Sequence, residues 1–84
     1  MAHRRAQPKL LAAKLLQIRL SLGVGQYRMA KLLKLDPARF TARISEYEAG
    51  KREPNLLIVL AYSRAARVPV EYLIDDNLDL DDAY

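Results

Sequence analysis

The 84-residue sequence contains no cysteine and only one histidine, His3, close to its start. Without cysteine the chain can form neither disulfides nor thiolate metal sites. A histidine with no clustered partner is neither a metal site nor a catalytic base, and the sequence also lacks a glycine-rich phosphate loop and any carboxylate cluster before residue 75. These absences argue against an enzyme, and we expect no metal and no cofactor.

Long apolar runs are missing as well. None approaches the roughly 20 residues needed to cross a bilayer, and no apolar signal segment follows Met1. We therefore expect a cytoplasmic protein without a membrane partner. Apolar residues make up 51% of the chain, which indicates a globular rather than a disordered protein. Its length suits one domain with a small core, since so short a chain buries only about 60–65% of its unfolded surface.

Charge is distributed unevenly along the chain. Residues 75–84 contain five aspartates and no lysine or arginine, so the net charge of +4 for the chain becomes +9 for residues 1–74. A basic domain of this size suits a polyanion such as nucleic acid. The alternative is a solvated basic surface without such a partner.

The apolar spacing predicts an all-α fold of five short helices. Residues 1–7 are expected to form a basic flexible arm, residues 8–74 the folded domain and residues 75–84 an acidic tail. The expected helices span about 8–21, 26–33, 37–48, 56–66 and 70–74. The third has two possible starts: Asp36 as N-cap with Pro37 in the first turn, or a longer loop with Thr41 as N-cap.

The stretch from residue 18 to residue 54 has the outline of a helix-turn-helix DNA reader. Two short helices are joined by a tight connection, and the second ends at Ala49-Gly50, directly before Lys51-Arg52. Its sequence resembles the XRE/Cro family of phage-repressor-like DNA-binding domains, over roughly residues 10–74. The resemblance rests on Ile18-Arg19, Gly23-Val24, Gln26, Met29-Ala30, Ile44-Ser45, Glu48, Gly50, Lys51-Arg52 and Pro54.

One departure from the family concerns the turn. Fourteen residues lead from Ala30 to Ile44, whereas the family usually has about ten, so about four residues, nominally Pro37–Phe40, are extra. Lys34 also replaces a glycine that is usual in the family. These changes predict a lengthened turn or a lengthened third helix.

The resemblance implies roles for several side chains. Arg19 and Glu48 would form a structural ion pair between the first and third helices. Gln26 would contact the DNA backbone and brace the third helix, which would lie in the major groove. The expected phosphate contacts are Gln26, Arg28, Lys51 and Arg52, which stand at or beside that DNA-facing side.

Base reading would fall to the outward face of the third helix. Arginine can grip guanine with two hydrogen bonds, and glutamate can accept from cytosine N4. The candidates on this face are Arg39, Thr41, Ala42, Arg43, Ser45 and Glu46. The alternative is that Arg39 or Arg43 contacts only phosphate, or that it pairs with Glu46.

A helix that is apolar nearly all round is either deeply buried or part of an interface. This describes residues 56–66, where Leu56, Val59 and Leu60 are expected to point inward. The excess apolar surface predicts a homodimer whose interface includes Tyr62, Tyr72 and Leu73.

The sequence thus predicts a sequence-specific regulator of transcription that binds double-stranded DNA, a repressor acting as a dimer on a palindromic operator. The alternative is an antitoxin-like or other protein-interaction module in which DNA binding is secondary. The acidic tail is expected to be disordered. Otherwise it binds a protein partner, or it folds onto the basic face and competes with DNA.

Overall fold

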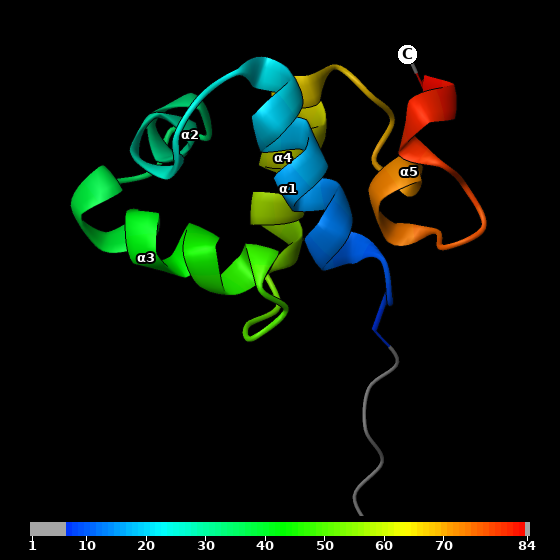
Figure 1. The fold of residues 1–84 in the computed structure, drawn as a ribbon, viewed down its shortest axis with the longest axis horizontal. Coiled ribbons are helices and arrows are strands. Elements are labelled where there is room, and N and C mark those ends of the chain that lie inside the picture. The colour runs from blue at the N-terminus through cyan, green and yellow to red at the C-terminus, as the bar shows by residue number, and fades with distance from the viewer. Residues whose placement is uncertain (1–6, 84) are drawn as a thin grey trace, which may run out of the picture.

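The computed structural model describes residues 7–83, and this part of the chain is all-helical. The helices are α1 (Leu11–Leu22), α2 (Gln26–Leu32), α3 (Pro37–Glu48), α4 (Leu56–Ala66), α5 (Glu71–Ile74) and a short 3₁₀ helix, η1 (Leu80–Ala83). Helices α1 and α4 lie at the centre, with α2 and α3 on one side and α5 and η1 on the other (Figure 1). The predicted five-helix fold is confirmed, whereas most of the basic arm, including Arg4 and Arg5, lies outside the described residues.

Helix α3 begins at the earlier of its two possible starts. The Asp36 carboxylate accepts a hydrogen bond from the Ala38 backbone N–H at 3.1 Å, and Pro37 occupies the first helical position. An N-cap of this kind satisfies a donor that the helix itself leaves free, and proline has no such donor to lose. The extra residues therefore lengthen α3 by about one turn at its N-terminus.

The core is drawn from all five α-helices. Its fully buried large side chains are Leu15, Ile18, Met29, Ile44, Tyr62, Leu73 and Leu80. Two expectations for α4 are wrong. Leu56 is 82% exposed, because the first turn of α4 extends beyond the core, and Tyr62 is covered by the chain itself.

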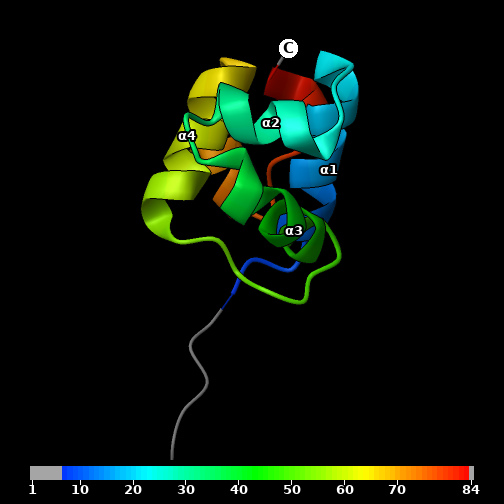
Figure 2. The same cartoon turned by 90° about the vertical axis from the view of Figure 1, so that its left-hand side faces the viewer.

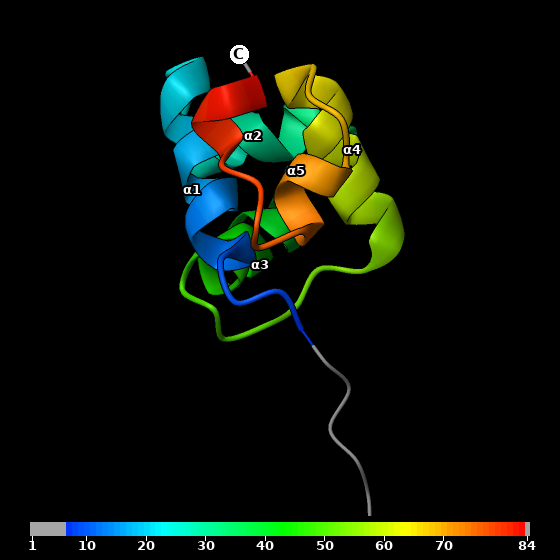
Figure 3. The same cartoon turned by 90° about the vertical axis from the view of Figure 1, so that its right-hand side faces the viewer.

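The acidic segment is not disordered where the structure describes it. Residues 75–83 fold back on α1, and Leu80 of η1 is only 1% exposed. Figure 3 shows η1 and α5 beside α1, and Figure 1 shows both at the far end of the molecule from α2 and α3. Residues 75–83 therefore do not cover the basic α2–α3 side. The interpretation in which the tail folds onto the basic face and competes with DNA required such a placement.

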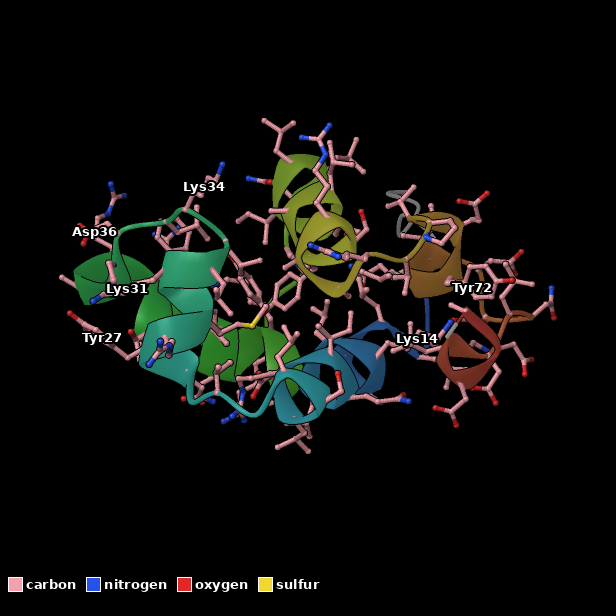
Figure 4. All side chains as sticks on the ribbon, turned by 90° about the horizontal axis from the view of Figure 1, so that it is seen from above. Lys14, Tyr27, Lys31, Lys34, Asp36 and Tyr72 are labelled. Atoms are coloured by element: carbon pink, nitrogen blue, oxygen red, sulfur yellow. The ribbon has the colours of Figure 1, made fainter. Side chains whose placement is uncertain are left out.

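Lys14 of α1 holds residues 75–83 against the helix through hydrogen bonds. Its ammonium group donates to the backbone carbonyls of Tyr72 at 2.7 Å, Asp75 at 3.0 Å and Leu78 at 2.8 Å, and the residue is only 5% exposed (Figure 4). The Asp76 carboxylate accepts from the backbone N–H groups of Lys9 and Leu10, just before α1. These hydrogen bonds lower the pKa of Asp76.

None of the helices within residues 7–83 combines the length and apolar character needed to span a bilayer.

Candidate nucleic-acid interface

Helices α2 and α3 form a helix-turn-helix unit. They pack against each other, and Figure 2 shows α2 lying across α3. The connection, residues 33–36, is held by hydrogen bonds from Lys34 N–H to the Lys31 carbonyl and from Leu35 N–H to the Ala30 carbonyl, both 2.9 Å. Lys34 has φ of 60°, a left-handed conformation that favours glycine. The turn thus keeps the backbone shape of a glycine-containing turn although its residue is lysine.

A hydrogen-bonded network fixes the C-terminal end of α3. Arg19 Nε lies 2.6 Å from Glu48 Oε2, and Arg19 Nη2 lies 3.0 Å from Glu48 Oε1. Gln26 Nε2 donates to Glu48 Oε1 at 3.1 Å, and Arg19 Nη1 donates to the Val24 carbonyl. The Arg19 and Glu48 side chains are only 15% and 6% exposed, and the hydrogen bond to Glu48 raises the pKa of Arg19. This ion pair is the one that the resemblance implies. It joins α1 to α3, and the hydrogen bond from Gln26 adds α2 to the network.

The base-reading candidates occupy the outward side of α3, because Ile44 and Tyr47 point into the core. Among the six candidates, Arg39, Ala42 and Ser45 are exposed, while Thr41, Arg43 and Glu46 are half-buried. The Thr41 hydroxyl donates to the Pro37 carbonyl at 2.6 Å. In this arrangement it can only accept a hydrogen bond from a base.

The charged side chains of α3 do not form the ion pair between Arg39 or Arg43 and Glu46 that the sequence left open. Glu46 Oε2 lies 3.5 Å from Arg52 Nε rather than pairing with Arg43. The Arg52 side chain is 50% exposed and the Glu46 side chain 39%, so solvent screens this ion pair and it is weak. The guanidinium carbons of Arg39 and Arg43 instead lie 5.9 and 5.2 Å from the centre of the Phe40 ring.

The phosphate candidates come from three elements. Arg28 is exposed on α2, Lys51 and Arg52 are exposed directly after α3, and Gln26 is half-buried at the start of α2. Gln26 Nε2 carries two protons and gives one to Glu48, which leaves the other for a ligand.

Two features of this region were missed in the sequence. Lys31 lies with its ammonium 5.0 Å from the centre of the exposed Tyr27 ring, and Figure 4 shows both with Lys34 at the α2 end of the molecule. The i,i+4 spacing of Tyr27 and Lys31 was the available signal. The second feature is the contact of Phe40 with two arginines, since Phe40 is named from the sequence only as one of the extra residues 37–40.

The expected dimer interface needs correction. Tyr62 and Leu73 are both completely buried within one chain, so neither can meet a second copy without unfolding. Tyr72 is half-buried, and its carbonyl accepts from Lys14. Among residues 7–83 no cluster of acidic residues, histidine or cysteine could hold a metal ion.

The comparisons with known proteins rest on the fold. No protein-family model and no curated protein sequence matches the chain. Among solved structures, it is similar to the P22 c2 repressor protein, determined in complex with synthetic operator 9T in the presence of Tl⁺. The two are 25% identical with a TM-score of 0.68, and the match covers 81% of this chain and 97% of that chain. The chain therefore has the fold of a phage-repressor-type helix-turn-helix domain, as the resemblance of its sequence to the XRE/Cro family implies.

Proposed function

We propose that the protein is a transcriptional regulator that binds double-stranded DNA sequence-specifically, with α3 in the major groove, and that it acts as a repressor. The observation that carries this proposal is the rigid α2–α3 unit, held by the Arg19–Glu48–Gln26 network, with an arginine-bearing face of α3 turned to solvent. The similarity to the P22 c2 repressor, which is bound to a synthetic operator, supports it.

In this proposal the residues divide into two groups. Arg43 and Arg39 donate to guanine O6 and N7, Thr41 accepts from an exocyclic amine, and Glu46 accepts from cytosine N4. Ala42 and Ser45 lie close to the base edges beside them. Gln26, Arg28, Lys51 and Arg52 hold the phosphates and set the orientation of α3.

Two copies are needed because one short helix reads few base pairs. Leu56 and Leu57, at 82% and 76% exposed, are the most exposed large apolar side chains of the described chain. They begin α4, a few residues after Lys51 and Arg52, so a second copy packed there would present its own α3 near the same duplex. We propose that these leucines, rather than Tyr62 and Leu73, form the dimer contact on a palindromic operator.

The dimer contact is tested by sedimentation with and without operator DNA. Leu57→Glu should give a monomer and weaken operator binding. Leu20→Glu is the matched control, because Leu20 is 62% exposed on α1, and it should change neither property. A wild-type protein that stays monomeric on and off DNA would contradict the dimer.

Selection from a randomised DNA pool tests the main proposal. The wild type should select a palindromic motif, and Arg43→Ala should lose definition at one position per half-site, with about 5- to 150-fold weaker binding. Lys51→Ala should weaken binding to all sequences alike and reduce the salt slope by about one. Weak binding without a motif, falling steeply with salt, would mean that only the backbone is held.

The second candidate, a protein-interaction module, draws on Glu46 in the proposed reading face and on the exposed aspartates of residues 75–83. Its support is weaker, because Leu80, one of the two leucines of that segment, is buried within the chain. Stable co-purification with a partner protein, together with absence of a selected DNA motif, would favour this candidate.

A further inference from the structure

The sequence has a single phenylalanine, Phe40, at the end of the extra first turn of α3. Its side chain is half-buried and packs against the hydrophobic core. The guanidinium groups of Arg39 and Arg43 both lie over its ring, with Cζ at 5.9 and 5.2 Å from the ring centre. Both distances are within the range of cation–π attraction, about 6 Å. A ring anchored in the core thus contacts two exposed or half-exposed cations.

Neither arginine has a competing ion pair within residues 7–83. The nearest acidic candidate on the same helix, Glu46, pairs with Arg52, and Asp36 accepts from the Ala38 backbone. Within residues 7–83, the Phe40 ring is therefore the interaction partner of both guanidinium groups.

The local backbone keeps the ring in place. The Asp36 cap and the hydrogen bond from the Thr41 hydroxyl to the Pro37 carbonyl hold the first turn helical. Phe40 is three residues after Pro37, whose ring fixes φ, so this turn has little freedom to unwind. The extra turn of α3 is in this way a rigid support for an aromatic side chain.

Stacking and base reading use different parts of an arginine. A guanidinium that stacks on an aromatic ring uses its flat face, while its N–H donors lie in its plane and stay free for guanine O6 and N7. Holding a long side chain beforehand reduces the conformational entropy lost on binding. We propose that Phe40 is a positioning residue for DNA recognition, which holds Arg39 and Arg43 ready to read bases. This inference rests on the proposed function and deepens it.

Phe40→Leu is the first test, since leucine keeps an apolar contact with the core but has no ring. Affinity for the operator selected by the wild type should fall about three- to tenfold, and the motif should lose definition at the positions read by the two arginines. Binding to random DNA and the salt slope should stay unchanged, because no charge is lost. Phe40→Trp should retain the motif. Leu35→Ala, another half-buried apolar side chain at the turn, is the control for a purely structural loss.

Pentafluorophenylalanine at position 40 keeps the size of the ring while reversing its quadrupole, so it tests the interaction even if the leucine variant does not fold. It should reproduce the loss of motif definition. In the DNA-free protein, the side-chain protons of Arg43 should show upfield ring-current shifts that vanish in Phe40→Leu.

The possible failures are distinguishable. If the wild type selects no motif, both the proposed function and this inference fail. If it selects a motif that the leucine and pentafluoro variants read with the same definition and affinity, only the positioning role of Phe40 is overturned. Arg43 shifts that are the same in the wild type and Phe40→Leu would also overturn it.

Discussion

Helix α1 carries two inward-facing cations, Lys14 and Arg19, which hold opposite ends of the molecule in different ways. Lys14 donates to three neutral carbonyls and fixes the C-terminal segment. Arg19, five residues later and so on a different side of the helix, makes a two-point contact with the Glu48 carboxylate and fixes α3.

The difference follows from the shapes of the two cations. An ammonium group is compact and has three rotatable donors, so it suits carbonyls that converge from an irregular backbone. A guanidinium is planar and matches a carboxylate in one orientation, so it also sets the direction of its partner helix. We infer that the Lys14 end contributes stability alone, whereas the Arg19 end contributes both stability and the placement of the reading face.

Replacing Lys14 by methionine should have the largest effect on stability. Three partly buried carbonyls would lose their common donor, at up to about 1–3 kcal/mol for each unsatisfied group, and this loss is partly relieved if residues 75–83 detach. We expect the free energy of unfolding, measured in urea, to fall by about 4 kcal/mol. The exposed Lys9→Met is the control and should stay within about 0.5 kcal/mol. A loss below about 1 kcal/mol would show that water replaces the ammonium group.

Glu48→Ala removes the carboxylate that Arg19 binds at the α3 end of the molecule. It leaves the Arg19 guanidinium largely buried with only the Val24 carbonyl, and it removes the acceptor of Gln26. We expect about 3 kcal/mol of destabilisation, because a buried charge loses its partner. Operator affinity should also fall under conditions where the variant is folded, which Lys14→Met should not cause.

The control for this loss is Glu46→Ala on the same helix. The exposed ion pair of Glu46 with Arg52 predicts a change in stability below about 1 kcal/mol. Glu48→Ala with unaltered operator affinity would contradict the positioning role of the Arg19 end.

The sequence could predict features that depend on neighbouring residues better than contacts between residues far apart in the chain. The Asp36-Pro37 helix start is local, because it depends on residues within three positions, and it is present. Asn55 caps α4 in the same local way, since its side-chain oxygen accepts from the Ile58 backbone N–H at 2.9 Å. The Arg19–Glu48 pair was accessible only through a family resemblance. The role of Lys14 carried no signal, because its partners are backbone carbonyls 58–64 residues away that any sequence provides.

The lack of a local signal for contacts between distant residues also explains the wrong predictions for residues 75–84 and for Tyr62 and Leu73. Five aspartates in residues 75–84 indicate disorder by composition, and a single buried leucine, Leu80, with the Lys14 contacts outweighs that tendency. Tyr62 and Leu73 were assigned to an interface because residue spacing cannot tell a surface covered by the same chain from one covered by a second copy.

Exchanging the cation types should separate charge from geometry. Arg19→Lys keeps the charge but loses the two-point contact, so we expect about 1–2 kcal/mol of destabilisation. Lys14→Arg introduces a larger planar group that cannot direct donors to all three carbonyls, and about 1–3 kcal/mol is expected from overpacking. Urea unfolding of both variants measures these changes in the free energy of unfolding. Wild-type stability in either would mean that only the charge matters at that end.

Tyr62→Phe should have the smallest effect at neutral pH, and of opposite sign. Tyr62 is completely buried beside the Arg19 end, and its hydroxyl has no hydrogen-bond partner within residues 7–83. Removing an unsatisfied buried hydroxyl should raise the free energy of unfolding by about 1 kcal/mol. A lower stability than the wild type would show that the hydroxyl has a partner such as a bound water.

The same substitution predicts a pH dependence. Burial, and then the Glu48 charge, raise the pKa of Tyr62 above its ordinary value near 10. Above about pH 10 the hydroxyl therefore ionises in the unfolded chain while it stays protonated in the folded chain. The contribution of Tyr62 to the free energy of unfolding is thus complete below pH 10 and declines as pH rises. The decline approaches about 1.4 kcal/mol per pH unit. Urea unfolding at pH 7, 9, 10.5 and 11 should show the advantage of Tyr62→Phe widening only above pH 10. Because the two proteins differ at position 62 alone, parallel stability curves would mean that Tyr62 ionises as easily in the folded chain as in the unfolded one.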